Sequence, residues 1–152
     1  MEEKIENIHF VEGLDFELPE NKRNLIIIDD QMNTSVNDKR INWLFTQGIH
    51  HHSTSIVFIN QNLFPQGKYS VNIRKNINYL IVLKSPTFKS SVRDLGWKLF
   101  PESPRFLYSA YASATDSNPY TYLVIDVHPK SHDKLRVRSG ILPGENFIIY
   151  IP

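Results

Sequence analysis

Short apolar runs alternate with polar segments along the chain, and these runs predict strands. They lie at residues 24–29, 55–60, 79–83, 120–127, 135–139 and 147–151, and a further strand is expected at 8–11. Apolar residues at helical spacing predict helices over residues 38–46, 88–100 and 103–115, with Gly48 ending the first. Because strands and helices alternate to about residue 115, we expect an α/β fold with a largely parallel sheet, helices on its faces and a β-rich C-terminal end.

The first strong run ends in two adjacent acids: residues 25–30 read Leu-Ile-Ile-Ile-Asp-Asp. Four apolar residues in a row predict a central strand that is covered on both faces. Two neighbouring carboxylates at its end cost desolvation energy unless a cation or a proton offsets it. This is the Walker B pattern of nucleotide hydrolases, in which Asp29 would hold Mg²⁺ and Asp30 would orient the attacking water. The alternative is a strand-to-loop corner at which an aspartate caps a turn.

A second apolar strand, at residues 56–59, ends in Asn60, Gln61 and Asn62. Nucleotide hydrolases of the additional-strand type place a polar residue at the end of the strand beside the Walker B strand. Gln61 suits that position, because an amide offers both a donor and an acceptor without charge to a γ-phosphate or a lytic water. An Asn/Gln-rich turn is the alternative interpretation.

Several cationic residues are candidates for DNA contacts or for a finger that reaches a neighbouring subunit's nucleotide. Arg136 and Arg138 alternate on a predicted strand, so both side chains point to one face. Arg74 lies in a basic stretch before the strand at 79–83. Arginine suits the finger role because its planar fork spreads charge over phosphoryl oxygens. A solvated surface charge is the alternative for each of them.

Two further groups of residues invite metal chemistry. Three consecutive side chains, His50 to His52, cannot all face one ion in regular structure, so a solvent-exposed or phosphate-contacting loop is favoured over a zinc site. A Mg²⁺-dependent nuclease or phosphatase built on Asp29 and Asp30 is a third functional class. It would need further acids at neighbouring strand ends, with Asp94 and Asp126 as the candidates.

Composition narrows the possible classes of protein. The 152 residues suit a single domain, and the absence of cysteine excludes disulfides and thiolate metal sites. A formal net charge of +1 gives no overall attraction to nucleic acid or to an anionic membrane. No apolar run approaches the roughly 20 residues that cross a bilayer, so we expect an intracellular protein with no membrane partner.

A phosphate loop is absent from the chain. That loop needs glycine-rich backbone followed by Gly-Lys-Ser/Thr, and the six glycines here are scattered. The nearest sequence, Gly67 followed by Lys68 and Tyr69, lacks the hydroxyl residue.

With these features in place, the chain resembles the genome-packaging ATPases of Polinton (Maverick) elements and adinto-type viruses, in the FtsK–HerA superfamily of DNA-pumping motors. The resemblance runs from about residue 8 to the C-terminus. The segments that carry it are 44–51, 55–64, 66–68, 79–84, 122–126, 135–138 and 142–145. The Gly-x-His-His to Gln-Asn-Leu-Phe stretch is the most specific of them.

The resemblance implies a partial P-loop NTPase of three-layer sandwich architecture, beginning after the Walker A segment. It implies Mg²⁺ and ATP as cofactors, with Asp29 and Asp30 as Walker B acids and Gln61 as the polar sensor. Double-stranded DNA, other copies in a ring and capsid portal proteins are the implied partners. The implied location is a virion assembly site, or the nucleus or cytoplasm of a host.

The chain departs from the family pattern at two places. The family commonly has arginine after the double histidine, where this chain has His52, and Asn-Pro-Arg-Asp after the Lys84 strand, where residues 85–88 read Ser-Pro-Thr-Phe. Without a Walker A segment, we expect the chain alone to bind ATP weakly or not at all. A non-catalytic binding or assembly domain derived from such an ATPase is the alternative.

Overall fold

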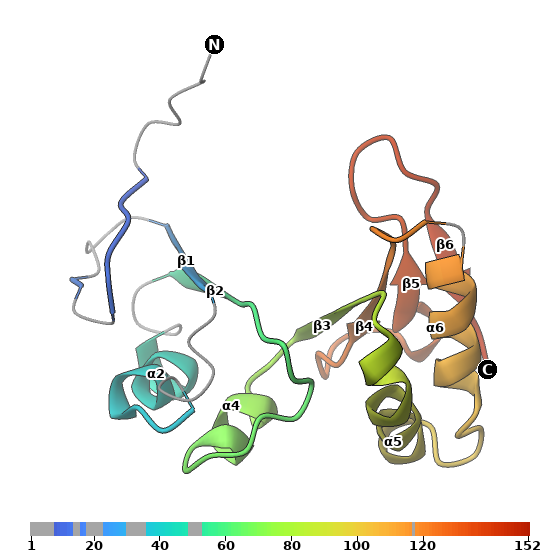
Figure 1. The fold of residues 1–152 in the computed structure, drawn as a ribbon, viewed down its shortest axis with the longest axis horizontal. Helices are drawn as coiled ribbons and strands as arrows, with labels where there is room; N and C mark the ends of the chain where they lie inside the picture. The colour runs from blue at the N-terminus through green and yellow to red at the C-terminus, as the bar shows by residue number, and fades with distance from the viewer. Residues whose placement is uncertain (1–7, 14–15, 18–22, 30–35, 49–52, 117) are drawn as a thin grey trace. The chain divides into compact units, whose positions relative to one another are not determined.

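The computed structural model describes residues 8–13, 16–17, 23–29, 36–48, 53–116 and 118–152. Figure 1 names the elements along the chain. The chain divides into two compact units, one of residues Met1–Gln61 and Gln66–Ile73 and the other of Asn62–Pro65 and Arg74–Pro152. A single domain over 1–152 stays a prediction.

The first unit contains a pair of parallel strands. β1 (Asn24–Ile28) pairs with β2 (Thr54–Phe58), and Asn24 lies opposite Thr54. Between them the chain forms the short helix α2 (Lys39–Trp43) and the π-helical turn η1 (Leu44–Gly48), so the predicted end at Gly48 is confirmed. The strand expected at residues 8–11 is wrong, because that segment forms no strand.

Helix α2 begins at a side-chain cap. The carboxylate of Asp38 accepts the backbone N–H groups of Arg40 (2.6 Å) and Ile41 (3.4 Å), which have no partner within the first turn of a helix. The helix and the turn after it then bury their apolar side chains, of which Ile41 and Leu44 are almost fully excluded from water. The ring of Phe45 in the turn lies edge-on to that of Phe58 in β2, with 6.1 Å between their centres. The buried apolar residues of the first unit are Ile28, Val36, Ile41, Leu44, Phe45 and Ile73.

The second unit is built on a four-stranded sheet. β3 (Tyr79–Leu83), β4 (Tyr122–Asp126), β5 (Val137–Ser139) and β6 (Ile148–Tyr150) lie in that order, and every neighbouring pair is antiparallel. The predicted closing pair of short strands is therefore confirmed as β5 and β6. The prediction of a largely parallel sheet is wrong here, since β1 and β2 form the parallel pair among the described strands.

The connection after β3 explains this antiparallel order. After the single turn η2 (Pro86–Phe88), the chain forms two successive helices, α5 (Lys89–Leu99) and α6 (Phe106–Asp116), close to the ranges predicted for them. A single helix would carry the chain back to the end at which β3 begins, so the next strand would run parallel to β3. Two helices return it to the end where β3 finished, so Tyr122 lies opposite Leu83.

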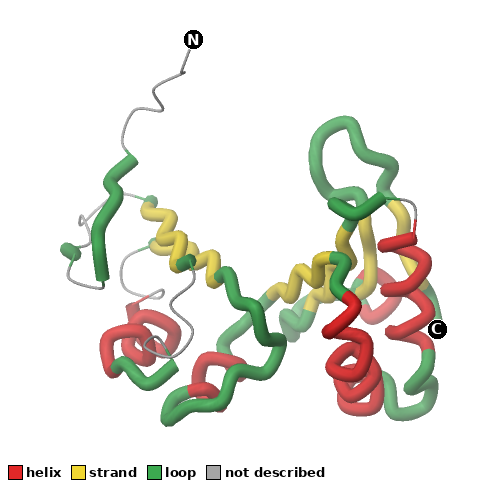
Figure 2. Tube along the Cα trace, viewed as in Figure 1, coloured by secondary structure: helices red, strands yellow, loops and turns green. Residues whose placement is uncertain are grey.

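Helices α5 and α6 cover one face of the four-stranded sheet (Figure 2). Alternate residues of each strand point to this face, as the two-residue period of a strand requires. The buried residues of the shared core are Val82, Val92, Leu95, Leu107, Ala110, Tyr111, Ala114, Leu123, Ile125 and Val137.

The hydroxyl group of Tyr111 in α6 fixes the end of β3. It accepts the backbone N–H of Ser85 at 2.8 Å and lies 3.1 Å from the carbonyl oxygen of Leu83 and 3.2 Å from that of Ser85. A buried phenol normally needs such polar partners. This one contact therefore joins helix α6 to the point at which the strand stops.

Gly96 allows α5 to approach the segment before α6. A Cβ atom at this position would lie 2.4 Å from the carbonyl oxygen of Pro104, a distance that requires the backbone to move. Glycine is normally unfavourable inside a helix by about 1 kcal/mol relative to alanine, so close packing explains its presence.

We predict that Gly96→Ala destabilises the second unit, although alanine is the better helix former. Overpacking of this kind costs about 1–3 kcal/mol, which exceeds the gain in helix propensity. Urea titration would measure the free energy of unfolding, with Ser90→Ala on the exposed side of α5 as the control. A Gly96→Ala variant as stable as that control would contradict the prediction.

Candidate functional site

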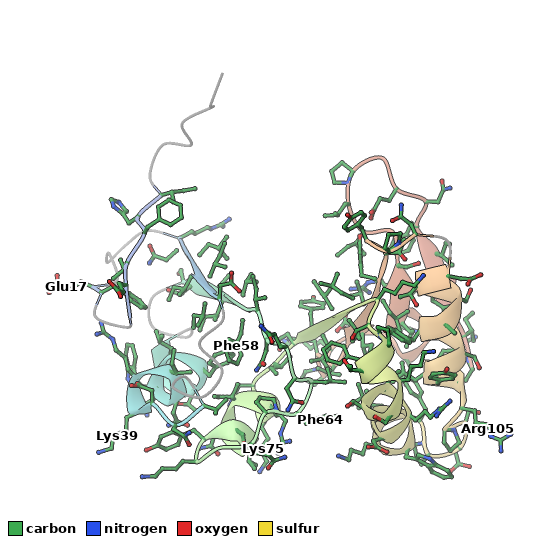
Figure 3. The ribbon with its side chains drawn as sticks, in the orientation of Figure 1. Glu17, Lys39, Phe58, Phe64, Lys75 and Arg105 are labelled. Carbon is green, nitrogen blue, oxygen red and sulfur yellow. The ribbon has the colours of Figure 1, made fainter. Side chains whose placement is uncertain are left out.

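The C-terminal ends of β1 and β2 lie at the same edge of their sheet, because the two strands are parallel. Ile28 lies opposite Phe58, and the N–H of Ile59 donates to the carbonyl of Ile28 at 2.9 Å, so the pairing continues past both strands. Figure 3 labels Phe58, the last residue of β2. Asp29 follows β1 directly, and Gln61 follows β2 in the same unit. The structure confirms that the strands before these two residues are neighbours.

One face of this parallel pair is exposed. Leu25 and Ile27 are 62% and 60% exposed, and Val57 on β2 is 45% exposed. The prediction that the strand is covered on both faces is therefore wrong for the part of the first unit that the structure describes. Asp29 is also exposed, and it continues the alternation of Leu25 and Ile27.

The donor chemistry at this edge suits a hard cation. A carboxylate at Asp29 and an amide oxygen at Gln61 are ligands of the kind that Mg²⁺ accepts, usually with several waters retained. Asp30, the second predicted acid, and the histidines at 50–52 lie outside the described residues. Within the described ranges, no three His, Cys, Asp or Glu side chains are grouped closely enough to hold a metal ion.

A second acidic strand end, at Asp126 in the other unit, is organised very differently. The residue is 3% exposed at the end of β4. One carboxylate oxygen accepts the hydroxyl of Ser131 at 2.8 Å and the N–H of His128 at 3.1 Å. The other oxygen lies 3.0 Å from Nη2 of Arg138, so the two side chains form a partly buried ion pair.

These contacts determine the charge state of Asp126. Burial by itself raises the pKa of the carboxyl group, since it disfavours the charged form. The hydrogen bonds from Ser131, His128 and Arg138, with the charge of Arg138, outweigh burial and lower the pKa below its usual value of 3.8. Asp126 is thus an ionised partner of arginine at neutral pH.

The prediction that Arg136 and Arg138 alternate on one strand is wrong, because β5 begins at Val137 and Arg136 ends the single turn before it; both guanidinium groups nevertheless bond around Asp126. Arg136 donates from Nη1 to the carbonyl oxygens of Asp126 (3.2 Å) and His128 (3.0 Å), and from Nε to the carboxylate of Asp133 (2.8 Å). Arg138 also donates to the carbonyl of Leu135 at 2.9 Å. Both guanidinium groups therefore fix the segment between β4 and β5. A finger or DNA-contact role for either residue stays a prediction.

Arg74 lies in the last turn of α4 (Ser70–Lys75), next to Lys75, which is labelled in Figure 3. Arg74, Arg136 and Arg138 belong to the second unit, whereas Asp29 and Gln61 belong to the first. The structure thus divides the predicted site residues into an acid and amide group and a set of arginines.

The nuclease alternative loses one of its candidate acids. The Asp126 carboxylate already accepts three hydrogen bonds, one of them from a cation, so it offers little to a metal ion. Asp94 lies exposed on α5 in the same unit.

Sequence reasoning missed the roles of Ser131 and Asp133 in this cluster. Ser131 binds the Asp126 carboxylate, and Asp133 pairs with Arg136 three residues later. The signal in the sequence was the acid at the end of an apolar strand, followed by a polar segment rich in turn residues. The same signal at Asp29 predicts a ligand for Mg²⁺.

Comparison with family models, with curated proteins and with solved structures finds no match to this chain. No helix among the described residues is both long enough and apolar enough to cross a membrane.

We predict that Asp126→Asn lowers the free energy of unfolding at pH 7 by about 1.5–3 kcal/mol, the contribution expected of hydrogen bonds to a charged group. The folded-state pKa is below the unfolded value, so this contribution is present above pH 3.8 and is lost as the pH falls through the folded-state pKa. The difference between the two proteins should therefore shrink at low pH in urea titrations.

Asp133→Asn is the matched control. Its side chain is 89% exposed, so its ion pair with Arg136 should contribute little to stability. A difference between wild type and Asp126→Asn that stays constant from pH 7 to below pH 3.8 would contradict a stabilising ionised carboxylate.

Proposed function

We propose that this chain is the C-terminal portion of a DNA-packaging ATPase core, which couples ATP hydrolysis to movement along double-stranded DNA. The observation that supports it is the parallel pairing of β1 and β2. This pairing brings the strand ends that precede Asp29 and Gln61 to the same edge of the sheet. P-loop hydrolases build their catalytic centre at such an edge of a parallel sheet. The resemblance of the sequence to packaging ATPases is the second support.

In this proposal each residue has a distinct role. Asp29 holds Mg²⁺ through its carboxylate, and Asp30 accepts a proton from the attacking water. Gln61 donates a hydrogen bond to the γ-phosphate or positions the water. Bound Mg²⁺ would neutralise the charge that develops on the phosphoryl oxygens.

The proposal requires a phosphate loop, and no Gly-Lys-Ser/Thr sequence occurs in the chain. The complete centre would be an additional-strand P-loop sandwich in which a further segment supplies that loop. Such motors act as rings, so the working form would be a homo-oligomer around DNA, with capsid portal proteins as further partners. On this proposal the site of action is a virion assembly site, or the nucleus or cytoplasm of a host.

A non-catalytic binding or assembly domain is the second candidate function. The contacts of Arg136 and Arg138 favour it, because both predicted fingers are bonded within their own unit. In that case the fold would be retained while the nucleotide chemistry is lost.

We predict ATP hydrolysis by a fusion that supplies a phosphate-loop segment, taken from a packaging ATPase that this chain resembles, ahead of residue 8. Asp30→Asn should lower kcat by about 10²–10⁴-fold, because it removes the general base. Steady-state phosphate release measures the rate, and Asp116→Asn, an exposed acid at the end of α6, is the control. Binding of Mg·ATP without hydrolysis, or equal rates for Asp30→Asn and Asp116→Asn, would favour the assembly domain.

The chain without any fusion permits an independent check. If Asp29 holds a divalent cation, paramagnetic Mn²⁺ should broaden the NMR signals of Ile28 and Asp29 before those of Asp116. Asp29→Asn should abolish this selectivity, since an amide is a weaker ligand than a carboxylate. Uniform broadening over all exposed acids would argue against a metal site at this strand end.

A further inference from the structure

Strand β3 forms one edge of the four-stranded sheet, and no described strand pairs with its outer side. The ladder to β4 fixes which backbone groups face outward. The N–H of Val127 donates to the carbonyl of Asn78 at 2.9 Å, and the N–H of Lys84 donates to that of Thr121 at 3.3 Å. Because these groups alternate along an antiparallel strand, even-numbered residues of β3 bond to β4 and odd-numbered residues face the open edge.

The same odd-numbered residues carry an uncovered apolar stripe. Tyr79, Ile81 and Leu83 are 53%, 57% and 56% exposed, respectively. The strand contains no charged residue, proline or bulge, the features with which proteins usually protect an edge against pairing. An open backbone edge and an apolar stripe therefore coincide on one five-residue strand, in which the carbonyl of Leu83 also accepts the hydroxyl of Tyr111.

The sequence of β3 is suited to pairing with itself. We propose that β3 is a docking surface for β3 of a second copy of this chain, in an antiparallel pair centred on Ile81. A two-fold axis there places Ile81 opposite Ile81 of the second copy and Tyr79 opposite Leu83 of that copy. Both Ile81 residues face the open edge, so each donates its N–H to the carbonyl of the other.

Charge also fits this register. The pairing places Lys84 opposite Asn78 of the second copy, so no like charges meet at either end of the strand pair. Tyr79 is held in place on its own sheet, since the guanidinium of Arg138 lies 6.0 Å from the centre of its ring. The two sheets would join into one continuous sheet with a single apolar stripe across the junction.

Two of the other described edges, those of β6 and β1, fit self-pairing less well. β6 is three residues long and offers a shorter ladder. On β1, Ile59 bonds to Ile28, so the outward residues are Leu25 and Ile27, and Asp29 follows them in the same alternation. A two-fold pair centred on Ile27 would bring the charged Asp29 against Leu25 of the second copy.

A pair of charge variants tests the register by sedimentation equilibrium. Tyr79→Lys with Leu83→Glu places opposite charges across the junction at both positions, so dimers should persist. Tyr79→Lys with Leu83→Lys places like charges there and should raise the dissociation constant by about tenfold or more relative to the first variant. Both variants lose the same contact with Arg138, so the comparison isolates the charge pairing.

A backbone variant tests the edge itself. Ile81→Pro removes the outward N–H but leaves the ladder to β4 intact, so it should abolish the dimer while the chain stays folded by circular dichroism. Trp97→Lys, which changes a 67% exposed apolar residue on α5, should leave the dimer unchanged.

Three results would overturn the proposal. The chain could be monomeric at every concentration, or the two charge variants could have equal dissociation constants. Hydrogen exchange at the Ile81 amide supplies the third: slow exchange in dilute, monomeric protein would mean that the edge is covered within one chain. Exchange that slows only as dimers form supports the proposal. None of these results depends on nucleotide or DNA.

Discussion

Parallel pairing of two strands requires the chain to travel back along the sheet before the second strand can begin. In the first unit this return includes α2 and η1, and the ring of Phe45 in η1 lies edge-on to that of Phe58 in β2. The proposed site at Asp29 and Gln61 depends on this constraint. Had the strands been joined by a hairpin, Asp29 and Gln61 would follow strands that end at opposite edges.

The two units place similar sequences in different environments. Ile28 ends β1 and Asp29 follows it, and Ile125 and Asp126 end β4, yet Asp29 is exposed whereas Asp126 is buried beside Arg138. An isolated buried carboxylate would be costly, and the hydrogen bonds around Asp126 compensate for that cost. The hydrogen bonds of the Asp126 carboxylate therefore join the end of β4 to the segment that follows it and to β5.

Local patterns in the sequence predict single elements better than the connections between them. The range of β3 agrees with its apolar run at 79–83, and α5 and α6 agree with the helical spacing. The sequence could not indicate the direction of β4, because that depends on how two helices pack in succession. Likewise, the ion pair of Asp126 with Arg138 depends on the register between β4 and β5, which the intervening segment sets. From the sequence alone, Arg136 and Arg138 are therefore predicted as finger or DNA-contact residues and not as partners of Asp126.

The hydroxyl of Tyr111 has a consequence for how far β3 can extend. Its bonds to Leu83 and Ser85 involve the last residue of the strand and a residue just past it, at the place where a longer ladder would continue. A helix residue from a distant part of the chain thus acts as a stop for the strand. The N–H of Ser85 is already bonded to this hydroxyl, so the ladder of any neighbour along this edge ends before Ser85, and a core side chain of the second unit sets that limit.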